Sequence, residues 1–389
     1  MALQKRVVVK LGTQVVIDQS NGAPVLPRLE AIVRDIARLR SSGIQAIVVS
    51  SGAVGMGRAA LGFQGALSLP EKQACAAVGQ SRLMALYEGI CASAGMRVAQ
   101  VLVTAQDFTS RSAYLNLRSS CDQLLSLGVL PIVNENDVVS TAGIRDSAGQ
   151  DVAPERRSFD DNDKLSALVA GKLLASTLVI LTNVDGVYTA NPQEDPGATR
   201  IARVGSFAEL AAISCSGRSM LGRGGMASKL EAAKIAALCG VRTVIASAAV
   251  LEPVIEAVAG RSGTTVDIQG TGVGLLSGRE RWIALASGFS GVVTVNRRAR
   301  EILERGTSSL LPVGVLRVEG DFGLGEVVSI IDELGEEFGR GLASQRSSSA
   351  RRVAGLRTDS ARPELASDER DELVHRDDLV IFSERPDAA

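Results

Sequence analysis

Histidine is almost absent from this sequence, which contains only His375, in a run of charges near the carboxyl end. A Ser-His-Asp triad, a Cys-His pair and a multi-histidine metal centre all need histidine in the active site. The chemistry available to this chain therefore depends on lysines, carboxylates and backbone donors.

Cysteine is also scarce and irregularly placed. The chain has five cysteines, an odd number, with no Cys-x-x-Cys pair among them. They are Cys75, Cys91, Cys121, Cys215 and Cys239. Neither a disulfide framework nor a zinc site is predicted, and a reducing cytoplasm is the expected compartment.

Long apolar runs and an excess of one charge are missing as well. No apolar stretch reaches the roughly 20 residues that span a bilayer, and no basic-then-apolar signal pattern opens the chain. The net charge is −1. This balance gives no electrostatic case for a dedicated nucleic-acid or membrane-surface protein, although it allows a local basic patch. We expect a soluble cytoplasmic protein of two domains, because single cores seldom grow beyond about 250–300 residues.

The stretch RVVVKLGTQVV at residues 6–16 joins a short β-branched run to a lysine and a glycine. Apolar residues on both faces predict a buried strand of a parallel sheet. Lys10 would then emerge at the carboxyl end of the strand, where open α/β sheets bind ligands. Gly12 and Thr13 could offer backbone and hydroxyl donors to an anion. An ordinary strand end with a solvent-facing lysine is the alternative.

Helical and strand-like apolar patterns alternate as far as residue 266. Helices are predicted at 29–39, 69–94, 114–127, 230–238 and 253–258, and strands at 7–9, 46–49, 98–103, 129–133, 177–181 and 241–246. This alternation predicts an α/β domain with three αβα layers and a mainly parallel central sheet. A second glycine- and hydroxyl-rich loop is expected at 50–57, after a strand.

Two polar clusters follow in the same domain. Asn134-Glu135-Asn136-Asp137 comes directly after a predicted strand, and its size favours a ligand role over simple capping. The acidic run at 160–163 meets the start of an apolar helix, where carboxylates are stabilised by capping and the helix dipole. Residues 142–158 lack periodicity and are predicted to form an insertion or lid.

The stretch GRGGMASK at residues 222–229 leads into a predicted helix. Glycines before a helix N-terminus suit a phosphate group, but the spacing is not that of a Walker motif. Two lysines beside glycines, Lys10 and Lys229, suit transfer of a terminal phosphoryl group, which needs positioning and charge neutralisation. A carboxylate such as Asp163 would have to hold them, because two unpaired ammonium groups repel.

From about residue 279 the basic residues are all arginine, apart from His375, and short β-like runs replace the alternation. We therefore predict domains at 1–266 and 279–389, the second small and mostly β. Residues 341–366, rich in serine and arginine, are predicted to be a loosely ordered loop.

The motifs VVVKLGT, SSGAVGMG, VNEND, DDNDKLSALVA, LTNVDGVYT and GRGGMASK occur in this order. Together they resemble the amino acid kinase family, and most closely its glutamate 5-kinases. The second domain resembles the PUA domain through RWI at 281, AREILERGTSSLLPVGV at 299 and HRDD at 375.

The resemblance implies transfer of the γ-phosphoryl of ATP, with Mg²⁺ on the ATP oxygens, to the side-chain carboxylate of L-glutamate. The product, L-glutamyl 5-phosphate, would be handed to a glutamyl phosphate reductase in proline biosynthesis. Proline would inhibit the enzyme, which is expected to be a cytoplasmic homo-oligomer. RNA binding by the PUA-like domain is a further possibility.

The resemblance also implies roles for individual residues. The catalytic residues would be Lys10, Asp163 and Lys229. The nucleotide would be bound by Lys10, Thr182, Asn183, Arg223, Gly224, Gly225, Met226, Ala227, Ser228 and Lys229. Glutamate would be bound by Ser51, Asp137 and Asn162. No protein ligand for Mg²⁺ is assigned.

The chain departs from the family pattern at three places. Residues 143–160 form a longer connection than an ordinary loop, beside the expected glutamate and proline sites. Asn183 stands where many members have aspartate, and Arg223 where they have threonine. Two alternatives remain open, which are another phosphotransferase of the family and an RNA-binding protein with a kinase-like scaffold. The second domain has slightly more acidic residues than arginines, which disfavours RNA binding.

Overall fold

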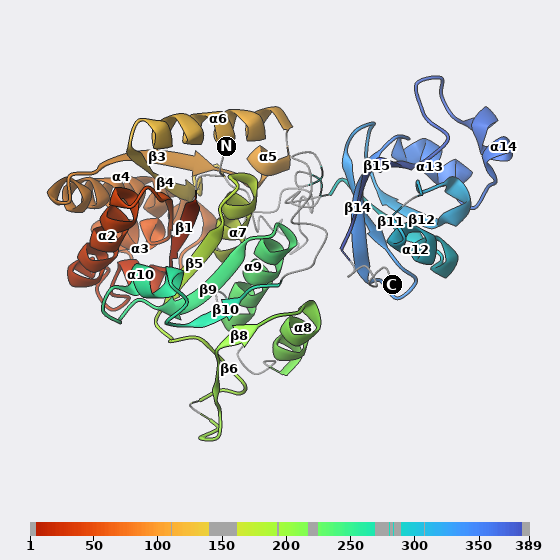
Figure 1. Cartoon of the computed structure of the whole chain (residues 1–389). Coiled ribbons are helices and arrows are strands. Elements are labelled where there is room, and N and C mark those ends of the chain that lie inside the picture. The colour runs from red at the N-terminus through yellow and green to blue at the C-terminus, as the bar shows by residue number, and fades with distance from the viewer. Residues whose placement is uncertain are drawn as a thin grey trace. The chain divides into compact units, whose positions relative to one another are not determined.

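The computed structural model describes residues 5–109, 111–139, 162–192, 194–216, 225–268, 289–306 and 308–382, together with residues 280 and 283. Contacts divide the chain into two compact units, Met1–Gln269 and Gly270–Ala389. The elements of both units are labelled in Figure 1. None of the described helices combines the length and apolarity that crossing a membrane requires.

The first unit is built on an eight-stranded sheet with the order β3-β4-β2-β1-β5-β9-β10-β8. Its strands are β1 (Arg6–Leu11), β2 (Gln45–Ser50), β3 (Arg97–Val103), β4 (Val129–Glu135), β5 (Thr177–Thr182), β8 (Arg203–Val204), β9 (Arg242–Ser247) and β10 (Thr264–Val266). All pairs are parallel except the antiparallel pair of β9 and β10. The prediction of a mainly parallel central sheet is confirmed. Strands β6 (Val187–Tyr188) and β7 (Arg200–Ile201) form a separate antiparallel pair.

Helices cover both faces of this sheet. They are α1 (Thr13–Val16), α2 (Leu26–Ser41), α3 (Ala53–Leu61), α4 (Leu69–Ser93), α5 (Ala105–Thr109), α6 (Arg111–Ser126), α7 (Asn162–Lys172), α8 (Phe207–Ser216), α9 (Met226–Leu238) and α10 (Pro253–Val258). Side chains alternate along a strand, so Val7, Val9 and Leu11 pack into the core with α2, α3, α4 and α10. Val8 and Lys10 therefore point to the opposite face, where α7 contacts β1 and α9 contacts β9.

The predicted loop at 50–57 is wrong over most of its length, because residues from Ala53 onward are helical. Gly52 ends the loop with φ at 109° and precedes α3 directly. Gly57 lies within this helix, and a Cβ there would lie 1.8 Å from the Cys75 carbonyl oxygen on α4. A Cβ on Gly79 of α4 would lie 1.7 Å from the Ala53 carbonyl oxygen. These two glycines let the backbones of α3 and α4 touch.

This contact predicts an unequal response to two identical substitutions on α4. Gly79→Ala should destabilise the unit by about 3 kcal/mol, because the added methyl group overlaps backbone atoms of α3. Gly89 is exposed on the same helix and nothing lies within 4 Å of its added Cβ. Gly89→Ala should therefore be neutral or stabilise by up to about 1 kcal/mol. Denaturant unfolding of both variants measures the difference, and equal midpoints would contradict the contact.

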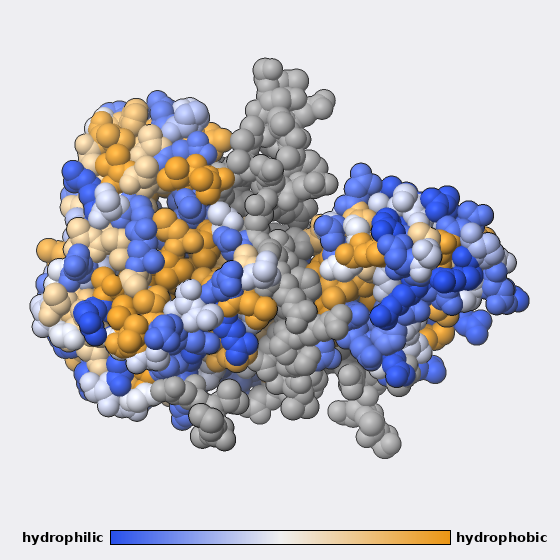
Figure 2. All heavy atoms as spheres, turned by 90° about the horizontal axis from the view of Figure 1, so that it is seen from above, coloured by the Kyte–Doolittle hydropathy of each residue, from blue (hydrophilic) through white to orange (hydrophobic). Residues whose placement is uncertain are grey.

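The second unit is mostly β, as predicted. Its sheet has the order β12-β11-β13-β14-β15. Its elements are β11 (Gly291–Val295), α12 (Arg297–Glu304), η2 (Pro312–Gly314), β12 (Val315–Gly320), β13 (Val327–Ile331), β14 (Glu337–Ala343), α13 (Ser347–Val353), α14 (Thr358–Ala361), η3 (Arg362–Glu364) and β15 (Val374–Ile381). Its core joins apolar residues of the sheet to residues of α12 and α13. The face of this unit seen in Figure 2 is largely hydrophilic.

The loosely ordered loop predicted at 341–366 is wrong. This stretch contains the end of β14, helices α13 and α14, and η3. Serines form part of its packed side, since Ser347 and Ser349 are buried beside the core residues Ala350 and Val353. The small serines give the segment a polar composition while allowing close packing, so composition alone was misleading.

Candidate active site

The carboxyl ends of the neighbouring parallel strands β4, β2, β1 and β5 lie side by side along one edge of the first unit's sheet. In register, Lys10 of β1 lies between Val49 of β2 and Ile180 of β5. Lys10 is only 3% exposed, so the alternative of a solvent-facing lysine is wrong. A buried ammonium needs a partner, because removing a charge from water is costly.

The partner of Lys10 is Asp163, which is completely buried at the start of α7. Helix α9 packs beside α7, visible in Figure 1, and brings Lys229 to the same carboxylate. Lys229 Nζ lies 3.0 Å from Asp163 Oδ2, and Ser228 Oγ donates to the same oxygen at 3.2 Å. Lys10 pairs with Oδ1, so one carboxylate bridges two lysines that are distant in sequence.

The electrostatics of this cluster favour a charged carboxylate. Burial raises the pKa of Asp163, but the Coulombic attraction of Lys10 and Lys229 and their hydrogen bonds outweigh it, leaving the pKa below the usual value. Counted by themselves, these three side chains carry one positive charge when both lysines are protonated. Ammonium groups held in a buried site are suited to an incoming phosphoryl group. Gly12 leaves room beside it, since a Cβ there would lie 3.7 Å from Lys10 Nζ.

A second, neutral cluster lies at the same edge of the sheet. Asn162, the first residue of α7, directs its Nδ2 toward three oxygens. These are Ser51 Oγ at 2.9 Å, Asn134 Oδ1 at 3.0 Å and the Ser50 carbonyl at 3.2 Å. The predicted substrate residues Ser51 and Asn162 are thus in direct contact. Asn134 belongs to the polar run 134–137, but it was missed as an individual site residue.

Asp137 follows the end of β4 and is half-buried. Burial, and then repulsion from Glu135, raise the pKa of Asp137 from 3.8 to about 6. No hydrogen bond within the described residues joins Asp137 to Ser51 or Asn162. Asp137 is therefore a partly buried carboxyl group two residues beyond the end of β4, the strand that carries Asn134.

The predicted nucleotide residues fall on two elements. Thr182 ends β5, and its hydroxyl donates to exposed Asn183 at 3.2 Å. Gly225 is the N-cap of α9, whose first turn carries Met226, Ala227, Ser228 and Lys229. The helix therefore begins four residues before its predicted start. Arg223, Gly224 and the long connection at 143–160 lie outside the described residues.

Among the described residues, no group of three or more His, Cys, Asp or Glu side chains could hold a metal ion. Asp163 is already engaged by two lysines. Phosphate oxygens of a bound nucleotide are the usual partners of Mg²⁺ in sites of this kind.

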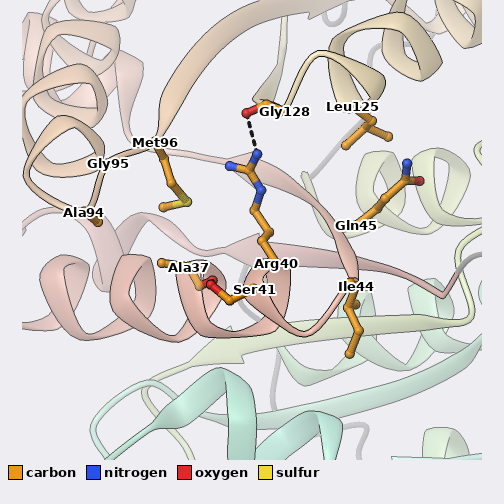
Figure 3. Close-up of a pocket in the computed structure, with 11 residues that line it drawn as sticks. Ala37, Arg40, Ser41, Ile44, Gln45, Ala94, Gly95, Met96, Leu125 and Gly128 are labelled. Carbon is orange, nitrogen blue, oxygen red and sulfur yellow. Dashed lines mark hydrogen bonds between the residues drawn. The ribbon is translucent and has the colours of Figure 1, made fainter.

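A pocket of about 410 Å³ lies at the opposite edge of the sheet (Figure 3). The turns that lead from α2, α4 and α6 into β2, β3 and β4 form its walls. Arg40 crosses this space and donates to the Gly128 carbonyl, and burial lowers its pKa. None of the predicted site residues lines the pocket, so it is separate from the two clusters described above.

Comparison with known proteins gives the same division of the chain. The amino acid kinase family model matches residues 5–247, and the PUA domain model matches residues 291–365. A glutamate 5-kinase of Ruegeria sp. (strain TM1040) is 40% identical over 383 residues, covering 98% of this chain and 99% of that protein. A glutamate 5-kinase of Gloeobacter violaceus is 42% identical over 379 residues, covering 97% of this chain and 99% of that protein. The chain therefore belongs to the amino acid kinase family and also contains a PUA domain.

Proposed function

We propose that this chain transfers the γ-phosphoryl group of ATP to the side-chain carboxylate of L-glutamate. The product is L-glutamyl 5-phosphate, and the reaction opens proline biosynthesis. The observation that carries the proposal is the carboxylate of Asp163 held between the ammonium groups of Lys10 and Lys229. The full-length similarity to glutamate 5-kinases supports the choice of substrate.

Transfer to a carboxylate explains how a site without histidine can work. The side-chain carboxyl of glutamate has an ordinary pKa of about 4.3, so it is already ionised at neutral pH. One of its oxygens attacks the γ-phosphorus, the bond to the bridging oxygen breaks, and ADP leaves with that electron pair. No proton has to be removed from the nucleophile. The protein's task is positioning and charge neutralisation.

Lys10 and Lys229 would neutralise charge on the transferring phosphoryl oxygens. Asp163 would act as a positioning residue, since its two oxygens fix the separation of the lysines. The N-terminal turn of α9 offers backbone N–H groups to phosphate oxygens, and residues 223–229 would contact the nucleotide. Thr182 and Asn183 would contact the nucleotide from the end of β5. Mg²⁺ would be carried on the phosphates.

Glutamate would bind at the neutral cluster. Ser51 and Asn162 provide hydrogen-bonding groups for its carboxylates, and Asp137 would pair with its ammonium group. Catalysis would reside in residues 1–266, with residues 279–389 forming the PUA domain. Proline inhibition, a homo-oligomeric state, a cytoplasmic location and delivery of the product to a glutamyl phosphate reductase belong to the same proposal.

RNA binding by the PUA domain has less support. Several arginines of the second unit are already paired with carboxylates, among them Arg346 with Asp368 at 2.7 Å and Arg351 with Asp321 at 3.1 Å. Such pairing reduces the positive field that phosphate-backbone binding requires. A gel-shift assay over a range of salt concentrations tests this reading, and tight binding that weakens steeply with salt would restore it.

Hydroxylamine trapping of the acyl phosphate tests the proposed reaction directly. Purified protein with ATP and Mg²⁺ should give a hydroxamate with L-glutamate and none with aspartate or N-acetylglutamate. Addition of proline should reduce the signal. Hydroxamate formed with another acid instead of glutamate would show that the proposed substrate is wrong. Absence of hydroxamate with every acid would refute the proposed reaction.

Asp137 predicts a specific pH dependence. If ionised Asp137 pairs with the substrate ammonium, the KM for glutamate should rise about fourfold between roughly pH 7.5 and pH 5.5, as a carboxylate of pKa about 6 becomes protonated. The KM for ATP should stay constant. Asp137→Asn should show a high glutamate KM that no longer changes over this range. A change confined to the KM for ATP would show that Asp137 does not bind glutamate.

The same variant separates binding from folding. The folded pKa of Asp137 lies above the unfolded value, so the stability associated with its protonated form is fully present below pH 3.8 and is lost as pH rises from there through about 6. An uncharged asparagine avoids this loss. Asp137→Asn should therefore unfold at the same or a higher temperature at neutral pH, although it binds glutamate poorly.

A further inference from the structure

A chain of side-chain amides runs behind the proposed glutamate site. Gln80 of α4 accepts from Asn134 Nδ2 through its Oε1 at 3.0 Å. Its Nε2 donates to Gln100 Oε1 of β3 at 3.2 Å. Asn134 in turn accepts from Asn162, which contacts Ser51. The chain thus leads from the exposed Gln100 through Gln80 and Asn134 to Asn162 and Ser51.

One backbone group sets the direction of the amides. Asn134 Oδ1 accepts from the backbone N–H of Glu135 at 2.9 Å, as well as from Asn162 Nδ2 at 3.0 Å. A backbone N–H can only donate, so the oxygen of Asn134 must face it. The Nδ2 group must then face Gln80, which has to present its oxygen. Each orientation in the chain follows from the one before it.

Burial makes the contribution of Gln80 hard to replace. Asn134 is 2% exposed and Gln80 is 9% exposed. An apolar side chain at position 80 would leave Asn134 Nδ2 buried without an acceptor, which is unfavourable. Rotating the Asn134 amide would not help, because Nδ2 would then face the N–H of Glu135 and the Nδ2 of Asn162. Either outcome weakens the contact that holds Asn162 beside Ser51.

We propose that Gln80 is a positioning residue for the carboxylate substrate. It fixes the orientation of Asn134, and Asn134 fixes Asn162 and Ser51 in the arrangement that receives glutamate. The inference rests on the proposed function, because it takes the neutral cluster to be the glutamate site. Gln80 itself contacts neither the lysine cluster nor the nucleotide residues through any bond in the described part of the chain.

Steady-state kinetics of Gln80→Leu test the proposal. Loss of one buried hydrogen bond predicts a rise in the glutamate KM of about tenfold, with kcat and the ATP KM within about twofold of the original protein. Gln100→Leu is the matched control, since it removes only the exposed end and leaves Gln80 Oε1 facing Asn134. Gln80→Glu keeps an oxygen acceptor and should recover most of the affinity.

A double substitution separates positioning from general damage. If Gln80 acts through Asn134, Gln80→Leu combined with Asn134→Leu should have the glutamate KM of Asn134→Leu alone. Multiplying effects would overturn the proposal, as would an unchanged glutamate KM in folded Gln80→Leu. Gln80→Met gives the same readout if the leucine variant does not fold. Original protein that phosphorylates no acid would refute the proposed function as well, whereas activity with an unchanged KM refutes only the positioning role.

Discussion

Replacement of Asp163 by asparagine is expected to lower kcat by about a thousandfold, which is the scale seen when a preorganised electrostatic group is lost. Asparagine keeps the size of the side chain but removes the charge between Lys10 and Lys229. The two ammonium groups would then repel each other and move apart or lose a proton. ADP release at saturating glutamate and ATP measures the loss.

The same substitution should also reduce stability. Asp163 is fully buried, and removing one partner of a buried ion pair typically costs about 3–5 kcal/mol. Because its folded pKa is lowered from 3.8, its contribution is present above that value and is lost as pH falls through the folded pKa. Asp163→Asn should therefore lose part of the acid-dependent unfolding of the original protein.

A matched control makes the Asp163 result specific. Asp359→Asn removes an exposed carboxylate from α14 in the second unit and should change neither kcat nor the unfolding midpoint. Near-normal turnover in folded Asp163→Asn would show that charge at this position is unnecessary. The bridging role proposed for Asp163 would then be wrong.

Lys229→Ala should lower kcat by about 10²- to 10³-fold with a smaller loss of stability. The alanine variant removes a charge that is proposed to meet the transferring phosphoryl group. Asp163 would retain Lys10 and the hydroxyl of Ser228 as partners, so the buried carboxylate stays compensated. Turnover and denaturant unfolding should therefore change by very different amounts.

Helix α9 contains its own control for this prediction. Lys234 lies on the same helix but is exposed, and Lys234→Ala should leave both kcat and stability almost unchanged. If Lys229→Ala retained full turnover, Lys229 would be a structural lysine. If both variants were equally impaired, the effect would come from helix α9 as a whole.

The central sheet was predictable because its signals are local. Short β-branched runs alternating with helical periodicity indicate parallel strands, and the observed sheet has this form. The position of Lys10 at a strand end was also readable, since Val7 to Val9 define the strand before it. Its pairing with Asp163 was expected, because two lysines at one site repel each other unless a carboxylate lies between them. The hydroxyl of Ser228, which donates to the same carboxylate, was not expected.

Contacts between residues distant in the sequence could not be predicted from the sequence. The glycines of the stretch 50–57 suggested a loop, yet Gly57 lies in α3 and allows close contact with the backbone of α4. Gln80 belongs to no sequence motif. Its proposed positioning role depends on hydrogen bonds between side-chain amides of α4, β4 and α7, which are distant in the sequence. The serine-rich stretch 341–366 misled for a related reason, since burial of small polar side chains depends on what packs against them.

The close contact of α3 and α4 at Gly79 links the heat tolerance of the protein to its affinity for glutamate. Its backbone touches the carbonyl of Ala53, just after the turn that carries Ser51, and the next residue along α4 is Gln80. Because glycine has no side chain, no substitution at this position can change the distance between the two helices by a small amount. A bulkier residue would displace the whole helix, and would shift heat tolerance and glutamate affinity together.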